Sequence, residues 1–386
     1  MLTPPPLSLY VHIPWCVQKC PYCDFNSHEL KHSIPESQYI EALLEDLSQD
    51  IERYRIERPI HSIFIGGGTP SLISSQGIAS LLTGIEQLLP FTPGIEITME
   101  ANPGTVEAKR FVGYRQAGVT RISIGVQSFH EHQLTRLGRI HGQQEAIQAA
   151  QLAHKIGLNS FNLDLMHGLP DQTLSEAMAD IDQAIALNPP HLSWYQLTIE
   201  PNTMFYYKTP VLPDDDQLWD IFEQGHQKLL AAGYHQYEIS GYSKENYQCQ
   251  HNLNYWRFGD YLGIGCGAHG KISFSDGDIV RTTKIKHPKG YLAAHNNMVK
   301  PYRDQEHSVP LEDRAFEYFM NRFRLLEPCP KEEFSQRTGL PIASITPIMD
   351  TLIQQQFLVQ SEQTWQITQK GKLFFNDVVG AFLKDS

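Results

Sequence analysis

Strand and helix patterns alternate along the first half of this 386-residue chain, and this alternation restricts its fold more than any other feature. Residues 7–13 alternate apolar and polar side chains as a half-buried strand does, and residues 38–54 repeat apolar side chains at helical spacing. The two patterns recur to residue 197, with strands predicted at 60–65, 95–100, 121–126, 160–165 and 192–197 and helices at 76–89, 105–116, 143–156 and 173–186. Such alternation predicts a parallel α/β sheet covered by helices.

The number of these units bears on whether the sheet closes. About six are visible, which is fewer than the eight of a closed (β/α) barrel. The sequence therefore predicts an open, partial (β/α)6 barrel as the first domain, over residues 1–300. A doubly wound sheet is the alternative, because a sequence does not determine the order of the strands.

Three cysteines follow the first predicted strand: Cys16, Cys20 and Cys23, with the spacing C-x3-C-x2-C. Thiolates are soft ligands that favour iron–sulfur clusters and zinc over hard cations. A structural zinc site normally has four ligands, whereas Phe25 stands where a fourth is most expected. We therefore predict a [4Fe–4S] cluster in which one iron has no protein ligand. A zinc knuckle and three unconnected buried thiols are the alternatives.

Glycine and polar residues recur where the predicted strands end. They are residues 66–70, Glu100 with Asn102, Gln127, Asp164, and residues 198–200. The carboxyl ends of parallel strands meet at one edge of an α/β sheet, where ligands bind. These residues therefore predict one ligand site close to the three cysteines.

The run from His12 to Phe25 resembles the cysteine motif of the radical S-adenosylmethionine (SAM) family, and Tyr22 before the third cysteine also fits that family. The resemblance implies that the amino and carboxylate groups of SAM chelate the open iron. Within it, the glycines at 66–68 let backbone approach SAM, and Glu100 supplies negative charge for a cationic part of it. Arg139 holds a carboxylate and Asp164 accepts hydrogen bonds from ribose hydroxyls.

Five further motifs resemble the oxygen-independent coproporphyrinogen III oxidase branch of the radical SAM family. They are L-Y-V-H-I-P at residues 9–14, G-G-T-P-S at 67–71, E-A-N-P at 100–103, G-V-Q-S-F at 125–129 and D-L-M-H-G-L-P at 164–170. The resemblance implies contacts to cluster-bound SAM from Tyr10, Gly67 and Glu100. For a second SAM, as in the oxidase, it implies contacts from Tyr22, Gly68, Thr69, Gln127, Arg139 and Asp164.

Two departures from that branch count against decarboxylation of coproporphyrinogen. The oxidase motif continues to a fourth cysteine where this chain has Phe25, and the oxidase has an N-terminal extension where this chain begins its first strand at Leu7. Whether the chain is an enzyme is therefore left open. The oxidase activity is the alternative function.

The H-N-x-x-Y-W run at residues 251–256 resembles the haem-binding motif of the haem chaperones in the same branch. The resemblance implies that the protein binds haem through His251, Asn252, Tyr255 and Trp256, delivers it to acceptor proteins, and receives electrons for its cluster from a donor. The residues alone leave alternatives open. A neutral imidazole is a good iron ligand, but His251 could instead form a hydrogen bond to the backbone in a loop that caps the barrel. Cys249, two residues earlier, is a rival iron ligand.

Glycines crowd residues 259–270, next along the chain. Because glycine disfavours helix, we predict a tight crossover or a ligand-approach loop here.

The pattern changes after residue 301. Helices are predicted at 311–323 and 343–355, with a short helix and turn at 330–339 and a two-stranded wing at 357–360 and 364–368. We therefore predict a winged-helix-like second domain over 301–386. Residues 303–386 carry nine Lys/Arg against twelve Asp/Glu, so their net charge is −3. This predicts a structural or partner-docking role and no nucleic-acid binding.

Composition and charge indicate which binding partners and which cell compartment fit this chain. The net charge of −12 argues against broad binding of phosphate backbones. The remaining cysteines, Cys249, Cys266 and Cys329, are scattered, so no disulfide framework is visible. Free thiols and an iron–sulfur cluster favour a reducing cytoplasm. We expect neither a signal peptide at the N-terminus nor a transmembrane segment.

Overall fold

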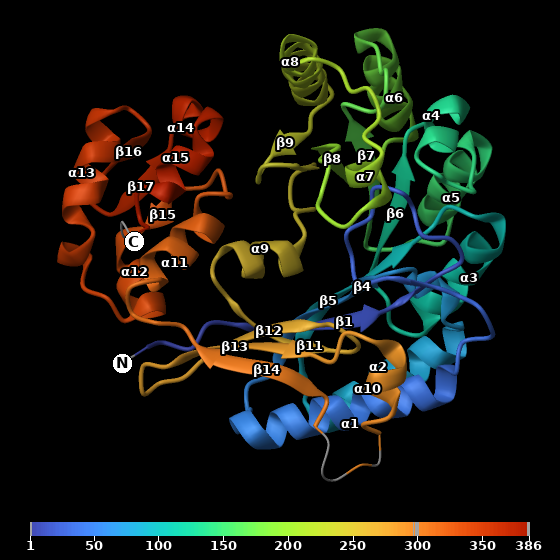
Figure 1. Cartoon of the computed structure of the whole chain (residues 1–386), viewed down its shortest axis with the longest axis horizontal. Helices are drawn as coiled ribbons and strands as arrows, with labels where there is room; N and C mark the ends of the chain where they lie inside the picture. The colour runs from blue at the N-terminus through green and yellow to red at the C-terminus, as the bar shows by residue number, and fades with distance from the viewer. Residues whose placement is uncertain (1, 296, 298–300, 384–386) are drawn as a thin grey trace.

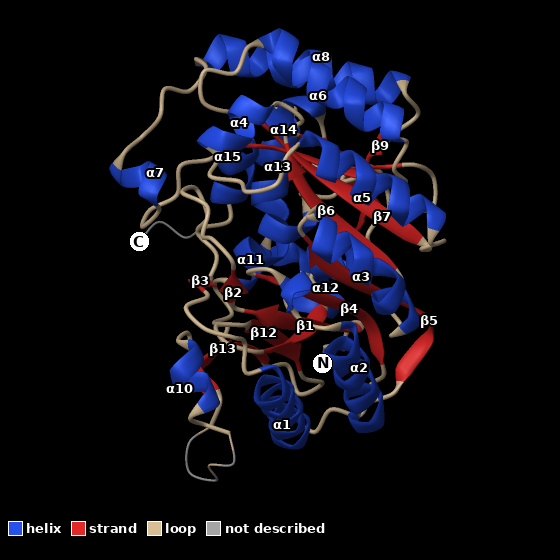
Figure 2. Cartoon of the chain, turned by 90° about the vertical axis from the view of Figure 1, so that its right-hand side faces the viewer, coloured by secondary structure: helices blue, strands red, loops and turns tan. Residues whose placement is uncertain are grey.

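The computed structural model of the chain describes residues 2–295, 297 and 301–383. In this part of the chain, helices cover the outer face of a large sheet, and the last part of the chain forms a smaller unit beside it (Figure 1). Figure 2 looks onto the outer layer of helices. None of the described helices is long and apolar enough to cross a membrane.

The predicted strands form the centre of the large sheet in their sequence order, each parallel to the next. They are β1 (Leu7–Ile13), β4 (Ile60–Gly67), β5 (Phe91–Ala101), β6 (Arg121–Gln127), β7 (Ser160–His167) and β8 (His191–Gln196). Over the described residues the sheet stays open, with β14 at one edge and β9 at the other. The partial (β/α)6 barrel is therefore confirmed, and the doubly wound alternative is wrong because its strand order would reverse within the sheet.

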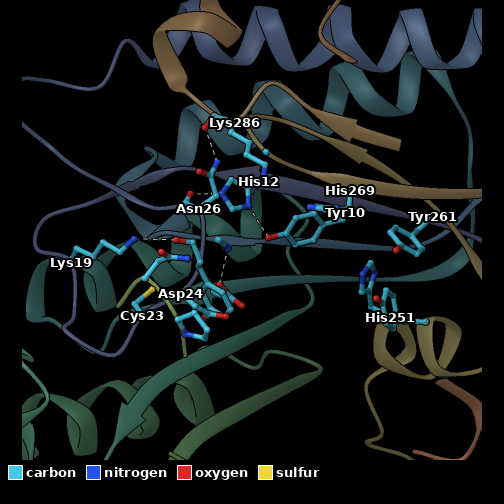
Figure 3. Close-up of a pocket in the computed structure, with 17 residues that line it drawn as sticks. Tyr10, His12, Lys19, Cys23, Asp24, Asn26, His251, Tyr261, His269 and Lys286 are labelled. Carbon is cyan, nitrogen blue, oxygen red and sulfur yellow. Dashed lines mark hydrogen bonds between the residues drawn. The ribbon is translucent and has the colours of Figure 1, made fainter. Parts of the chain in front are cut away.

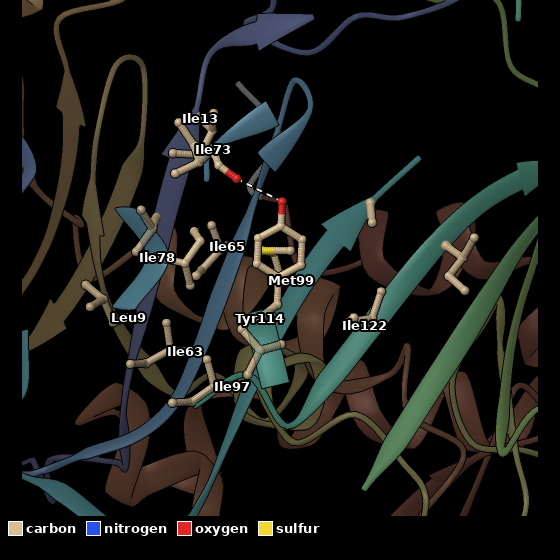
Figure 4. Close-up of a cluster of buried hydrophobic side chains, with 14 of the residues drawn as sticks. Leu9, Ile13, Ile63, Ile65, Ile73, Ile78, Ile97, Met99, Tyr114 and Ile122 are labelled. Atoms are coloured by element: carbon tan, nitrogen blue, oxygen red, sulfur yellow. Dashed lines mark hydrogen bonds between the residues drawn. The ribbon is translucent and has the colours of Figure 1, made fainter. Parts of the chain in front are cut away.

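The helices between the strands bury their apolar faces against the sheet. The longer ones are α1 (Glu36–Tyr54), α2 (Ser75–Leu88), α3 (Thr105–Gln116), α5 (Gln143–Lys155), α6 (Leu174–Leu187) and α8 (Asp215–Ala231), and the shorter ones are α4 (Glu131–Arg136), α7 (Met204–Tyr207) and α10 (Pro288–Leu292). The core beneath them takes one branched side chain from each neighbouring strand: Leu9, Ile63, Ile97 and Ile122 (Figure 4). This buried apolar layer packs neighbouring strands that run parallel in register, so their carboxyl ends meet at one edge, where the site lies.

Further strands extend the sheet at both edges. They are β11 (Asp260–Ile264), parallel to β1, then the antiparallel β12 (His269–Ser273), β13 (Ile279–Lys284) and β14 (Arg303–Ser308), and at the opposite edge β10 (Gly241–Ser243) and β9 (His235–Gln236). The loop predicted at residues 259–270 is therefore mostly strand. Its glycines serve close strand packing, because a Cβ at Gly263 would lie 1.9 Å from the carbonyl oxygen of His269.

The smaller unit has its own hydrophobic core and a three-stranded sheet ordered β15–β17–β16 within the described residues. Its elements are α11 (Arg314–Arg322), β15 (Cys329–Pro330), α12 (Lys331–Thr338), a 3-10 turn (Ile342–Ser344), α13 (Thr346–Gln354), β16 (Leu358–Gln360), β17 (Thr364–Ile367), α14 (Gln369–Leu373) and α15 (Phe375–Gly380). The predicted helices and wing form. Because β14 belongs to the large sheet, however, the division between the units lies nearer Val309 than the predicted residue 301.

A buried ionic network ties α1 to the added strands. The Lys284 side chain, 1 % exposed, donates hydrogen bonds to Asp46 and, at 2.7 Å, to Asp50 Oδ2. Asp46 Oδ2 also accepts from the Tyr291 hydroxyl at 2.7 Å and from the Gly265 amide at 3.1 Å. Both carboxylates and the ammonium are therefore paired away from water.

We expect Lys284→Met to lower the free energy of unfolding by about 3–5 kcal/mol, because it leaves two buried carboxylates without their cation. Urea titration followed by circular dichroism would measure the change. Lys155→Met, at an exposed position of α5, is the matched control and should stay within about 0.5 kcal/mol of wild type. Equal effects of the two variants would contradict a supporting role for the network.

Candidate functional site

Two adjoining cavities lie at the carboxyl ends of the parallel strands. The first has a volume of about 670 Å³ and the second about 460 Å³. They share part of their lining: Cys23, Asp24, Phe25, Gly67 and Glu100. The predicted cysteine loop and the predicted strand ends therefore meet in one place.

The cysteine loop leaves β1 and is closed by a short pair of strands. β2 (Trp15–Cys16) runs parallel to β3 (His28–Glu29). Inside the loop, the Cys23 amide donates to the carbonyl oxygen of Cys20 at 3.1 Å. Cys16, Cys20 and Cys23 all line the second cavity. The loop thus presents its three thiols to one space.

The three thiols are partly buried donors that could bind metal. Burial raises the pKa of the Cys16 thiol, and the nearby Cys23 and Cys20 raise it further. Ser27 Oγ lies 3.7 Å from Cys23 Sγ, within hydrogen-bonding distance of sulfur. In the part of the chain that the structure describes, no group of three or more His, Cys, Asp or Glu side chains could hold one metal ion. Three soft thiol donors fit a [4Fe–4S] cluster, and the zinc knuckle stays an alternative on this geometry.

Gly67 and Gly68 lie where the end of β4 touches the backbone that leaves β1. Gly67 has φ +114°, and a Cβ there would lie 2.5 Å from the His12 ring. A Cβ at Gly68 would lie 2.6 Å from the carbonyl oxygen of Trp15, and the Gly68 amide donates to Ile13 O at 2.7 Å. The sequence predicts that these glycines let the backbone approach a ligand. In the structure they first let the cysteine loop pack against the sheet.

The residues predicted to contact SAM gather around the second cavity, apart from Tyr10, which lines the first. Those in the second cavity are Tyr22, Gly67, Gly68, Thr69, Glu100, Gln127, Arg139 and Asp164. They come from the cysteine loop, from the ends of β4, β5, β6 and β7, and from the segment after α4. The roles predicted for them stay predictions.

Two buried carboxyl groups face this cavity. Glu100 Oε2 accepts from the Gly67 amide at 3.0 Å, and Asp164 accepts from Ser123 Oγ at 2.8 Å and from Asn162 Nδ2 at 2.7 Å. Burial, together with the nearby Asp164, raises the pKa of Glu100 to about 8. Glu100 is therefore mostly protonated at neutral pH, and a cationic ligand would favour its ionised form.

Arg139 braces the cysteine loop against the strand ends. Its Nη2 donates to Gly125 O at 2.6 Å and to Asn102 Oδ1 at 3.0 Å, and its Nη1 lies 3.8 Å from Cys20 Sγ. Its hydrogen bonds are thus already directed at the protein, whereas the sequence argument assigned the guanidinium to a ligand carboxylate.

Sequence reasoning missed Tyr195 among the residues of the second cavity. Its hydroxyl donates to Gln127 Oε1 at 2.9 Å, and Gln127 has the unusual φ of +70°. Tyr195 is the penultimate residue of β8, so the strand-end argument could have found it. Ser123 also lines this cavity but lies within a strand buried on both faces, where no sequence signal shows which side chains point toward a cavity.

α9 (Gln250–Trp256) forms part of the wall of both cavities, so the loop considered for this segment is wrong. His251 and Tyr255 line the first cavity, and Asn252 and Trp256 line the second. Residues four apart lie on one face of a helix, so each cavity receives one such pair. The four residues predicted as one set of haem contacts are thus divided between two cavities.

Glu96 holds the first residues of α9. Its Oε1 accepts from the backbone amides of Gln250 at 2.8 Å and His251 at 3.3 Å, and the Cys249 thiol lies 3.5 Å away. Cys249 is 3 % exposed and lines neither cavity. It is therefore not a rival ligand in this arrangement.

His251 offers one ring nitrogen to the first cavity (Figure 3). Its Nδ1 lies 3.2 Å from Ser62 Oγ, which is the one hydrogen bond of the ring within the described residues. Burial lowers the pKa of the ring to about 3, so the imidazole is neutral at physiological pH. This is the form that binds metals. The partner of Nδ1 is a side chain, not the backbone considered from the sequence.

The smaller C-terminal unit contacts the far end of α9. Arg257, just after the helix, makes two hydrogen bonds of 2.8 and 2.7 Å to the Glu327 carboxylate. The Arg324 guanidinium lies 4.5 Å from the centre of the Trp256 ring. Elements that line the cavities are therefore linked to the C-terminal unit.

Comparison with known proteins agrees with this architecture. The model of the radical SAM superfamily matches residues 10–184, and the model of the HemN C-terminal domain matches residues 309–374. The chain is 61 % identical to the heme chaperone HemW of Escherichia coli over the full length of both chains. The chain belongs to the HemW family. It is also 35 % identical to the HemW of Bacillus subtilis, over 97 % of this chain and 99 % of that one.

A solved structure shows how far the HemW fold is shared. The coproporphyrinogen III oxidase HemN of Escherichia coli, a radical SAM enzyme, superposes with a TM-score of 0.82 at 22 % identity. The match covers 98 % of this chain and 90 % of that one. At this identity the likeness establishes the fold of both units and not the activity.

Gly68→Ala tests the packing role of this glycine. The added Cβ would press on the Trp15 carbonyl beside Cys16, so we expect the reconstituted variant to retain less than about half of the wild-type iron and sulfide, since displaced ligands bind metal less well. Gly380→Ala is the control, because a Cβ there meets no atom within 4 Å. If the variant keeps its full iron content but binds SAM more weakly, the glycine is instead needed to let SAM approach the backbone.

Proposed function

We propose that this chain is a haem chaperone. It holds a [4Fe–4S] cluster and SAM in the second cavity, takes haem into the first, and delivers the haem to acceptor proteins. The observation that carries the proposal is α9, which lines both cavities with one helical face each. The family relation supports it, because relatives similar over the whole chain are named heme chaperones.

Cys16, Cys20 and Cys23 would hold the cluster, and its open iron would take the amino and carboxylate groups of SAM. Once reduced by a donor protein, the cluster supplies the electron that radical SAM chemistry uses. The chain orients SAM through the strand ends and keeps Glu100 ready to balance positive charge. The free thiols also support the reducing, cytoplasmic setting predicted from the sequence.

Haem would lie in the first cavity, against His251 and Tyr255. A neutral imidazole suits an iron ligand, and aromatic side chains offer faces to a flat macrocycle. Tyr10 and Tyr261 also line this cavity, which lies within the usual range of ligand pockets, about 300–1,000 Å³. Asn252 and Trp256 lie on the other face of the helix, which lines the second cavity, where SAM is proposed to bind. Haem binding could therefore respond to what occupies the second cavity.

Oxygen-independent coproporphyrinogen III oxidase activity is the second candidate. The observation that favours it is the full set of predicted SAM residues around the second cavity, including those predicted for a second SAM. Against it, Phe25 stands at the cavity edge, 57 % exposed, where the sequence argument expects a fourth cysteine in an oxidase.

One experiment separates the two functions. Anaerobically reconstituted protein is mixed with haem in one sample and with coproporphyrinogen III, SAM and a reductant in another. A haem spectrum of fixed stoichiometry without protoporphyrinogen supports the chaperone. Repeated turnover to protoporphyrinogen without haem uptake overturns it. A variant with all three loop cysteines changed to Ala is the control without a cluster.

The affinity for SAM should rise with pH. Because the Glu100 carboxyl has a pKa raised to about 8, it is protonated below that pH and must lose its proton to balance a cation. Affinity should be about tenfold weaker at pH 7 than at pH 9 and should level off above the pKa. Calorimetric titration of wild type and Glu100→Gln would isolate this carboxyl, since the variant keeps only the pH dependence of the ligand. Identical pH profiles would contradict the assignment.

His251→Ala should weaken haem binding by about tenfold or more, which corresponds to about 1.4 kcal/mol, and should shift the haem absorption bands. Cluster absorption and SAM binding should persist, because their residues lie on other elements, and they also report that the variant is folded. His154→Ala, on the exposed side of α5, is the control. An unaltered haem spectrum in His251→Ala would move the ligand to another residue of the first cavity, with His269 the next candidate.

A further inference from the structure

We propose that Lys19 and Lys286 form a carboxylate-binding site at the mouth of the first cavity, which takes the acidic side chains of a porphyrin macrocycle. This inference rests on the proposed function and deepens it. It adds a reason why the protein would select a macrocycle with acidic groups along one edge.

The two lysines come from distant parts of the chain but line the same cavity. Lys19 lies on the cysteine loop, and Lys286 follows β13. Both side chains are exposed, and neither forms an ion pair with any Asp or Glu that the structure describes. Lys19 Nζ makes only two long hydrogen bonds, of 3.3 Å to Phe25 O and 3.4 Å to Ser27 O. An ammonium has three donors and gains most from a charged acceptor, so both remain available to an anion.

His269 and Lys286 line the same cavity and lie close enough to interact electrostatically. Burial lowers the pKa of this histidine, and the positive charges of Lys286 and Arg281 lower it further. His269 lines the same cavity, so the positive field of Lys286 reaches the cavity wall. Arg281 is already paired with Glu317 at 2.7 Å, whereas Lys286 forms no ion pair within the part of the chain that the structure describes. Lys286 is therefore the cation that a ligand carboxylate could use.

The lysines lie opposite the proposed iron ligand. In Figure 3, Lys19 and Lys286 lie toward one end of the cavity and His251 and Tyr261 toward the other. A macrocycle whose iron faces His251 would thus direct one edge toward the lysines. The wall between these ends is mixed, with the aromatic Tyr10 beside polar side chains such as Asn26, so the cavity offers an aromatic face as well as a basic mouth.

The charges that oppose this site are few. Asp24 and Glu100 also line the cavity, and Asp24 is exposed at its edge. Glu100 lies deeper and is held mostly neutral at pH 7 by its burial. Because the whole chain carries a net charge of −12, two unpaired lysines at one cavity mouth are not explained by a generally basic surface. Neither lysine lines the second cavity, so SAM binding does not account for them.

Comparison of haem with its dimethyl ester tests the inference, because the ester keeps the macrocycle and the iron but removes both acidic groups. Absorbance titrations would use cluster-loaded, full-length protein. We expect wild type to bind haem at least tenfold more tightly than the ester. The preference should fall as salt rises, because exposed charges are screened. The double variant Lys19→Met/Lys286→Met should lose most of the preference while binding the ester as wild type does.

Two further variants control the measurement. Lys155→Met/Lys208→Met removes two exposed lysines outside the cavity and should keep the full preference. The single variant Lys286→Met leaves the cysteine loop unchanged and should lose part of the preference for haem over the ester. Because Lys19 is intact in this variant, the loss cannot come from an effect of Lys19 on the cluster. If wild type binds both compounds equally, or if the double variant keeps its preference, the inference is overturned while the proposed function stands. If wild type takes up neither compound, the proposed function itself fails.

Discussion

The site depends on one close approach of backbone to backbone. At the end of β4, Gly68 touches the chain between Ile13 and Trp15, so tightly that a methyl group would collide with a carbonyl oxygen. This contact fixes where the cysteine loop leaves the sheet, and Arg139 then joins the loop to the ends of β5 and β6. Without these contacts, nothing would hold the exposed turns of the loop in the position in which its three thiols face one cavity.

α9 gives the second organising principle. A helix of seven residues is marginal by itself, so its position comes from its surroundings. Glu96 accepts its first amide groups, and Leu253 packs with Tyr237 and Leu325 in a small apolar cluster. The helix thereby becomes a shared partition, and its two faces turn neighbouring sequence positions toward different cavities. The residues of this one helix can therefore contact both ligands of the proposed chaperone.

The central fold could be predicted because the period of apolar residues changes from strand to helix along the chain, and six parallel strands appeared where expected. The added strands β11 and β12 could not be predicted, because their glycines reflect packing between strands that only the tertiary structure brings together. Within the site, motif residues such as Glu100 and Asp164 were found from their places at strand ends. Lys19 and Lys286 were not, since an exposed lysine has no distinctive sequence environment and only the folded chain shows that the two share a cavity.

The link between the C-terminal unit and α9 has a thermodynamic consequence. Arg324 lies against Trp256, and Glu327 holds Arg257, so displacing this unit disturbs a helix that lines both cavities. Linkage is reciprocal: a partner that alters haem affinity by a given factor when it binds this unit must have its own affinity altered by haem by the same factor. An acceptor that weakens haem binding as it docks would consequently be released more readily by the loaded protein than by the empty one. The acceptor would correspondingly bind the empty protein more tightly than the loaded one.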